Sequence, residues 1–159
     1  MLSKAQIQHI KSLENKKFRQ EYGEFIIEGQ KMVMELIGTP GPFRIKKLYL
    51  EEGSPIPAVA HEAEYLTAKE MERISSQSTP SGALAVLEIP KVPVALPQKG
   101  HLYLALDGVR DPGNFGTILR LADWFDIAAV YASPDCVELY NPKTVQSTMG
   151  AILRVPVHY

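Results

Sequence analysis

The stretch that decides the fold runs from Asp107 to Asp123 and reads D-G-V-R-D-P-G-N-F-G-T-I-L-R-L-A-D. The run before it, H-L-Y-L-A-L-D, is apolar and typical of a strand, whereas residues 116–125 favour a helix. Asn114 lies in the turn-forming segment D-P-G-N and is a favourable N-cap. Because the first turn of a helix has free N–H groups, this strand, turn and helix start predict a platform for phosphates or other polar ligands.

Two residues of the predicted helix lie four positions apart, Gly116 and Arg120, and therefore share one helix face. Gly116 has no side chain to cover that face, so a ligand or another backbone could approach Arg120. Taken without further context, Arg120 could instead be a surface arginine paired with Asp123 or Asp126.

Seven residues in fixed register resemble the first signature motif of the SpoU (TrmH) branch of the SPOUT RNA methyltransferases. They are Asp111, Pro112, Asn114, Gly116, Arg120, Ala122 and Asp123. The resemblance continues downstream at residues 140–143, 147–151 and 155–157, and upstream at residues 25–29 and 80–85. The upstream segments resemble the ribosomal-protein-L30e-like substrate-binding domain that precedes the catalytic domain in this family. Together these segments extend the resemblance over nearly the whole chain.

The resemblance implies an α/β fold, with a small L30e-like α/β/α domain followed by the first part of a knotted, Rossmann-like SPOUT domain. In the family, two later motifs form a trefoil knot that holds S-adenosylmethionine, and nothing after Tyr159 supplies them. We therefore expect a truncated fragment of a longer enzyme, with the knot segment and the cofactor pocket absent. We also expect Ile152, Leu153, Val155 and Val157 to lack their apolar cover.

The activity that the resemblance implies is methyl transfer from S-adenosylmethionine to a ribose 2′-hydroxyl of ribosomal or transfer RNA. It makes Arg120 the central catalytic residue, with Asn114 beside it. An arginine is a poor base because its pKa exceeds about 12. Arg120 is therefore expected to grip the acceptor phosphate and polarise the hydroxyl. Asn114 could equally act only as a helix cap.

Further substrate-binding candidates come from charge. Residues 1–50 hold nine Lys or Arg and five Glu, a balance of +4, although the whole chain has a net charge of −1. Such a basic cluster can contact RNA phosphates or can be a solvated helix face. We predict RNA contacts from the following residues: Lys16, Lys17, Arg19, Glu28, Arg110 and Gly116. Phe18, Tyr22 and Phe25 could stack on unpaired bases or belong to the core.

Composition excludes several classes of protein. No run approaches the roughly 20 apolar residues of a membrane helix, and the first ten residues lack the apolar core of a signal peptide. The single Cys136 excludes an internal disulfide, and the four histidines have no metal-ligand spacing. We expect a cytoplasmic protein without a metal site.

Domain boundaries follow from residues 90–100, P-K-V-P-V-A-L-P-Q-K-G, whose three prolines predict an extended linker between domains at 1–89 and 101–159. The alternation of helices and strands predicts parallel or mixed sheets covered on both faces. The expected helices lie at 3–21, 30–37, 67–75, 115–125 and 142–149, and the strands at 25–27, 47–50, 83–89, 102–106, 128–132 and 152–158.

Two other functions remain open at this stage. The chain could be a non-catalytic RNA-binding module, in which residues 1–89 recognise folded RNA. A nucleotide-binding doubly wound domain is disfavoured because the turn lacks the spacing G-x-G-x-x-G that admits a pyrophosphate. The family resemblance also implies a homodimer, for which the small residues at 147–150 are a plausible close-packing site, while Trp124 and Phe125 are expected to be buried against the sheet.

Overall fold

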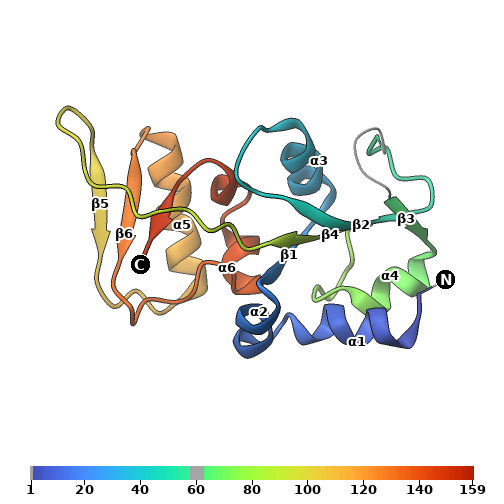
Figure 1. Cartoon of the computed structure of the whole chain (residues 1–159). Helices are drawn as coiled ribbons and strands as arrows, with labels where there is room; N and C mark the ends of the chain where they lie inside the picture. The colour runs from blue at the N-terminus through green and yellow to red at the C-terminus, as the bar shows by residue number, and fades with distance from the viewer. Residues whose placement is uncertain (1, 58–62) are drawn as a thin grey trace. The chain divides into compact units, whose positions relative to one another are not determined.

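The computed structural model describes residues 2–57 and 63–159 and divides into two compact units, Met1–Pro90 and Lys91–Tyr159 (Figure 1). Residues 89–102 form neither helix nor strand, and the division lies at the start of the proline-containing segment expected to be a linker.

A four-stranded sheet with the order β1-β4-β2-β3 forms the centre of the first unit. Its strands are β1 (Glu24–Glu28), β2 (Ile45–Glu51), β3 (Ala63–Leu66) and β4 (Ala83–Glu88). β4 pairs antiparallel with β1 and β2, and β2 pairs parallel with β3, so the sheet is mixed. β3 has no counterpart among the expected strands, because A-E-Y-L is short and lacks a clear apolar alternation.

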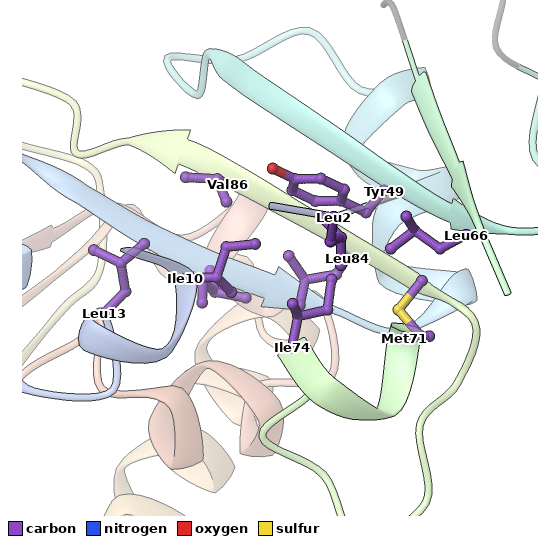
Figure 2. Packing of buried hydrophobic residues seen from close by; sticks show 10 residues of the cluster. Leu2, Ile10, Leu13, Tyr49, Leu66, Met71, Ile74, Leu84 and Val86 are labelled. Atoms are coloured by element: carbon purple, nitrogen blue, oxygen red, sulfur yellow. The ribbon is translucent and has the colours of Figure 1, made fainter. Parts of the chain in front are cut away.

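Helices cover both faces of this sheet, which gives the expected α/β/α layering. Figure 1 shows α3 (Gln30–Gly38) on one face and α1 (Lys4–Ser12) with α4 (Ala68–Ile74) on the other. Every residue of β1 is buried, as expected for a strand covered on both sides. Figure 2 shows the core on the α1 and α4 face, which consists of Leu2, Ile10, Leu13, Ile26, Tyr49, Leu66, Met71, Ile74, Leu84 and Val86.

Local sequence signals set the helix starts in this unit. Ser3 with Gln6, and Thr67 with Glu70, form capping boxes, in which each side chain bonds the other residue's backbone N–H. The single helix expected over 3–21 is wrong, because α1 ends at Ser12 and α2 (Lys16–Tyr22) begins after a turn. Asn15 caps α2 by accepting a hydrogen bond from the Lys17 N–H.

A three-stranded parallel sheet forms the second unit, with β5 (Tyr103–Leu106), β6 (Ala129–Ala132) and β7 (Val157–His158) in that order. The connections contain α5 (Pro112–Trp124), α6 (Pro142–Ser147) and the short 3₁₀ helix η1 (Ala151–Leu153). The strand predicted over 152–158 is therefore wrong for most of its length. Ile152, Leu153 and Val155 are buried rather than uncovered, since η1 and the following turn fold them inward.

Candidate functional site

The motif turn after β5 is fixed by hydrogen bonds to the loop that follows β6. The Gly108 N–H donates to Ser133 Oγ at 2.9 Å, and the Val109 N–H contacts Cys136 Sγ at 3.3 Å. Gly108 has a φ of +63°, a conformation that side chains with a Cβ rarely adopt. The turn therefore has a defined shape that sets where α5 begins.

Asp111, rather than Asn114, is the N-cap of α5. The Asp111 carboxylate accepts a hydrogen bond from the Asn114 N–H at 2.7 Å, and Pro112 occupies the first helical position. The prediction that Asn114 caps the helix is therefore wrong, because the helix begins earlier than expected. Asn114 lies in the first turn with an exposed side chain, and its amide does not act as the cap.

Gly116 is a packing glycine. A Cβ at this position would lie 2.0 Å from Ser147 Oγ and 2.6 Å from the Ser147 backbone carbon. The Ser147 hydroxyl donates to the Pro112 carbonyl at 2.7 Å and so joins α6 to the first turn of α5. Of the two approaches that the sequence left open, a ligand or another backbone, the structure shows a backbone. Gly116 is thus not an RNA-contacting residue here, because α6 occupies its face.

Arg120 is exposed on α5, one turn beyond Gly116. Within residues 2–57 and 63–159, no hydrogen bond or ion pair holds its guanidinium group. The alternative partner Asp123 is already paired, since Arg154 Nη2 and Nε lie 2.8 and 2.9 Å from Asp123 Oδ2. Arg120 is therefore available to a ligand.

A shallow cleft of about 490 Å³ lies along this side of α5, between α5 and the segment from Thr148 to Arg154. Arg120 and the Asp123–Arg154 ion pair form its polar part, and Leu121, Trp124 and Met149 form its apolar part. Its charged groups sum to one net positive charge. The cleft can accept an anionic group such as a phosphate, with apolar surface beside it.

Two aromatic residues at the end of α5 are exposed, contrary to the prediction that they pack against the sheet. Trp124 is 83% exposed and Phe125 67% exposed. They lie past the buried stripe of α5, which consists of Phe115, Gly116, Leu119 and Ala122. Leu121 and Met149 are also more than half exposed, so α5 and the end of α6 present an apolar surface beside Arg120.

Arg110, in the motif turn, pairs loosely with Asp135, with 3.4 Å between Nη2 and Oδ2. Hydrogen bonds from the Ser133 hydroxyl and from backbone lower the pKa of the Asp135 carboxyl, and the pair with Arg110 lowers it further. The Arg110 side chain is 78% exposed, so its other donors can still reach a ligand.

The predicted RNA contacts of the first unit divide into exposed and buried residues. Lys16 and Lys17 are exposed at the start of α2. Arg19 is only 1% exposed, and its guanidinium donates to the carbonyl oxygens of Leu13 and Glu14 at 2.8 and 2.9 Å. Arg19 is therefore a structural residue that closes the turn between α1 and α2, and its prediction as a surface RNA contact is wrong.

Glu28 is also buried and structural. Its carboxylate accepts hydrogen bonds from both the N–H and the hydroxyl of Ser76, at 3.1 and 2.9 Å, and from the Ser75 hydroxyl. It joins β1 to the loop that follows α4, so the prediction that it contacts RNA is not supported. Phe25 is fully buried, whereas Tyr22 is 41% exposed and stacks on Phe18 at a ring distance of 5.9 Å.

The site residues thus fall into two groups. Asn114, Gly116 and Arg120 share α5 in the second unit, whereas Lys16 and Lys17 belong to the first.

Residues 101–159 match the SpoU rRNA Methylase family, and residues 4–85 match the MRM3-like substrate binding domain. The chain belongs to the SpoU rRNA methylase family.

Curated relatives of this SpoU chain include the 23S rRNA (guanosine(2553)-2′-O)-methyltransferase RlmP of Bacillus subtilis, which is 30% identical over 150 residues. That alignment covers 92% of the chain and 58% of the relative. The human mitochondrial rRNA methyltransferase 3 is 30% identical over 158 residues, with 91% of the chain and 37% of the relative covered. The chain therefore spans less than two thirds of the length of these relatives.

Solved structures show the same SpoU fold. A putative RNA methyltransferase of the TrmH family from Porphyromonas gingivalis is 37% identical, with a TM-score of 0.85 over 99% of this chain and 62% of that one. An AdoMet-bound rRNA methyltransferase from Sinorhizobium meliloti is 28% identical, with the same TM-score and the same coverage. S-adenosylmethionine is therefore the cofactor found in this family.

The cleft beside Arg120 does not suit that cofactor. Its sulfonium centre is a cation, and the charged groups of the cleft already sum to a positive charge. In the part of the chain that the structure describes, no three His, Cys, Asp or Glu side chains are grouped as a metal site, and no helix has the length and apolarity needed to cross a membrane.

Proposed function

We propose that the whole protein transfers a methyl group from S-adenosylmethionine to a ribose 2′-hydroxyl of ribosomal RNA, with transfer RNA as the other candidate acceptor. One observation carries this proposal: a fully available arginine, Arg120, lies on α5 directly beyond the fixed turn of a SpoU motif. The relative from Bacillus subtilis, named as a 23S rRNA (guanosine(2553)-2′-O)-methyltransferase, supports the same chemistry.

Arg120 positions the acceptor in this proposal. The planar guanidinium donates two parallel N–H bonds, which can hold the phosphate next to the target ribose and keep its hydroxyl at a fixed distance. The positive charge also stabilises negative charge that develops on the 2′-oxygen as its proton leaves. S-adenosylmethionine, when bound, supplies an electrophilic methyl group on a sulfonium.

The rigid turn keeps Arg120 in place while the acceptor changes. Asp111 caps the first turn of α5, and the Ser147 hydroxyl on α6 donates to the Pro112 carbonyl. Rotation of α5 about its axis would break this bond to α6. Such preorganisation matters because displacements of about 1 Å can lower a catalytic rate about a hundredfold. The exposed Asn114 side chain lies about 1.7 turns before Arg120 and can bind the same acceptor nucleotide.

RNA binding by the first unit is the second part of the proposal. Lys16 and Lys17 are exposed at the N-terminus of α2, where two ammonium groups can contact successive phosphates. The match of residues 4–85 to a substrate binding domain supports this assignment. Without methyl transfer, the same residues would make the chain an RNA-binding module.

A homodimer is the third part. Leu121, Trp124, Phe125 and Met149 form an exposed apolar surface next to Arg120, and surfaces of this kind are typical of protein interfaces. A second copy of the protein on this surface would exclude water from the cleft that contains Arg120.

Methyl transfer can be measured directly with the whole protein, tritiated S-adenosylmethionine and unmodified ribosomal RNA. We expect incorporation at one nucleotide and an alkali-resistant dinucleotide, because a 2′-O-methyl group blocks hydrolysis of the next phosphodiester. RNA binding without incorporation into ribosomal or transfer RNA would contradict the proposal and support the non-catalytic module.

A further inference from the structure

The first unit contains a second cleft, which the site on α5 does not use. It has a volume of about 390 Å³ and lies between α1 and the sheet, at the end where β1 begins. Its floor is apolar and includes Ile10, Tyr49 and Val86, which belong to the core shown in Figure 2. Its rim is polar and includes His9, Lys46 and Lys47. Its size is within the range of small-ligand sites, which are about 300–1,000 Å³.

A β-bulge in β2 puts two lysines on the rim. The register between β2 and β4 shifts between Ile45 and Lys47, so Lys46 is an extra residue with no partner on β4. In a regular strand, Lys46 and Lys47 would point to opposite faces. With the bulge, both line the cleft, and bulges frequently redirect side chains beside binding sites.

The charges of the rim leave one lysine without a counter-ion. Glu24 is nearly buried and binds both Lys46 and His9, the latter with 2.7 Å between Nε2 and Oε2. In the described part of the chain, no acidic group pairs with Lys47. The cleft therefore combines an apolar floor, a neutralised polar cluster and an available ammonium group.

An aromatic side chain lies beside the rim residue His9. Tyr22 lies 4.9 Å from His9 between ring centroids and is 41% exposed. Unpaired bases of RNA bind proteins by stacking on such rings, while their phosphates bind lysines. An acidic peptide fits less well, because its carboxylates could reach Lys47 but it has no base to lie against the apolar floor.

We propose that this cleft binds one unpaired nucleotide of the RNA substrate, with the base against the floor and its phosphate at Lys47. This inference rests on the proposed function, because it assigns a specific RNA contact to the substrate-binding unit. The cleft would select single-stranded RNA next to the phosphates that Lys16 and Lys17 are proposed to contact.

The test is a titration of the isotope-labelled chain with uridine and guanosine 5′-monophosphates, followed by NMR. We expect saturable shifts at the amides of His9, Lys47 and Val86. Ala5→Trp should weaken binding at least about tenfold, since Ala5 is exposed on α1 and lines the cleft, where an indole ring would fill the space. Ala68→Trp is the matched control, because Ala68 is also exposed in the first turn of a helix.

A second pair of variants tests the phosphate contact. Lys47→Gln should weaken binding about fivefold, as expected for loss of one exposed charge contact of about 1 kcal/mol. Lys69→Gln, on the exposed surface of α4, should leave it unchanged within error. The fingerprint of each variant's spectrum shows whether it is folded.

Three outcomes would overturn the inference. The first is no saturable shift, or a shift that Ala5→Trp leaves intact. The second is an equal response to inorganic phosphate alone, which would show an anion site without a base contact. The third is equal competition by a hexaglutamate peptide. These results do not depend on methyl transfer by the whole protein, so failure of the cleft and failure of the proposed activity can be told apart.

Discussion

Replacing Gly116 with alanine tests the packing of α5 on α6, on which the position of Arg120 depends. The added Cβ would lie 2.6 Å from the Ser147 backbone carbon, which no change of side-chain rotamer can relieve. The helices must separate, and the Ser147 hydroxyl then loses its bond to the Pro112 carbonyl. Alanine itself favours the helix by about 1 kcal/mol over glycine.

These opposing effects determine how far Gly116→Ala lowers the free energy of unfolding. Overpacking a well-packed contact costs about 1–3 kcal/mol, and the lost hydrogen bond costs about 1 kcal/mol more. Against the gain in helix propensity, we expect a net loss of about 1–3 kcal/mol in the free energy of unfolding of the second unit. Urea unfolding followed by circular dichroism measures this loss, and amide hydrogen exchange over residues 112–150 assigns it to the second unit.

Gly38→Ala is the matched control, because Gly38 ends α3 and a Cβ there meets nothing within 4 Å. It should be neutral or stabilise by up to about 1 kcal/mol. Ser147→Ala should not rescue Gly116→Ala, since the Ser147 Cβ also lies 2.6 Å from the added atom. A Gly116→Ala chain as stable as the unchanged chain would refute the close approach of the two helices.

Four further predictions concern single residues. Asp111→Ala should cost about 1 kcal/mol through loss of the α5 cap, whereas Asn114→Ala should cost little; equal costs in thermal melts would contradict the assigned cap. Arg19→Ala should destabilise the first unit by about 2–4 kcal/mol, because the carbonyl groups of Leu13 and Glu14 lose their hydrogen-bond donor. Lys17→Gln should leave stability unchanged but should lower the salt dependence of RNA binding by about one unit of slope. Burial alone would raise the pKa of Glu24, but the hydrogen bonds and charges of Lys46 and His9 outweigh burial, so the pKa is lowered. The contribution of Glu24 to stability should therefore be complete above about pH 5 and should be lost as the pH drops below about 4. Glu24→Gln should flatten this pH dependence of the free energy of unfolding.

Local signals in the sequence predict much of this fold. Ser3 and Thr67 begin helices as their capping boxes indicate, and the apolar run 83–88 forms a central strand. These elements follow from short-range rules of hydrogen bonding and periodicity. The exposure of Arg120 was also predictable, because an arginine is rarely fully buried without a partner.

The residues that were mispredicted depend on tertiary contacts. In the sequence, Arg19 is one of several basic residues, and only the folded turn at Leu13 supplies the buried carbonyl that accepts its hydrogen bond. The sequence around Gly116 does not distinguish close packing against a ligand from close packing against Ser147. The strand expected after Gly150 fails because an apolar V- and I-containing run forms a buried 3₁₀ turn equally well when packed against α5.

The N-cap of α5 shows a different limit of prediction from sequence, because two residues could have started the helix. Asp111 and Asn114 are both good N-caps, and Pro112 is favoured at the first helical position. Their spacing allows the helix to start at either point. Pro112 decides for Asp111, because its fixed φ suits the first helical position and leaves Asp111 as the residue before it.

Arg120 is proposed to position the RNA acceptor, and the rate of single-turnover methyl transfer by the whole protein measures that role. Arg120→Ala and Arg120→Lys should both lower the rate at least about a hundredfold, because lysine lacks the planar pair of donors. Both should leave S-adenosylmethionine affinity and thermal stability unchanged, since no described group depends on the guanidinium. A rate within about threefold of the unchanged protein for either variant would contradict the account.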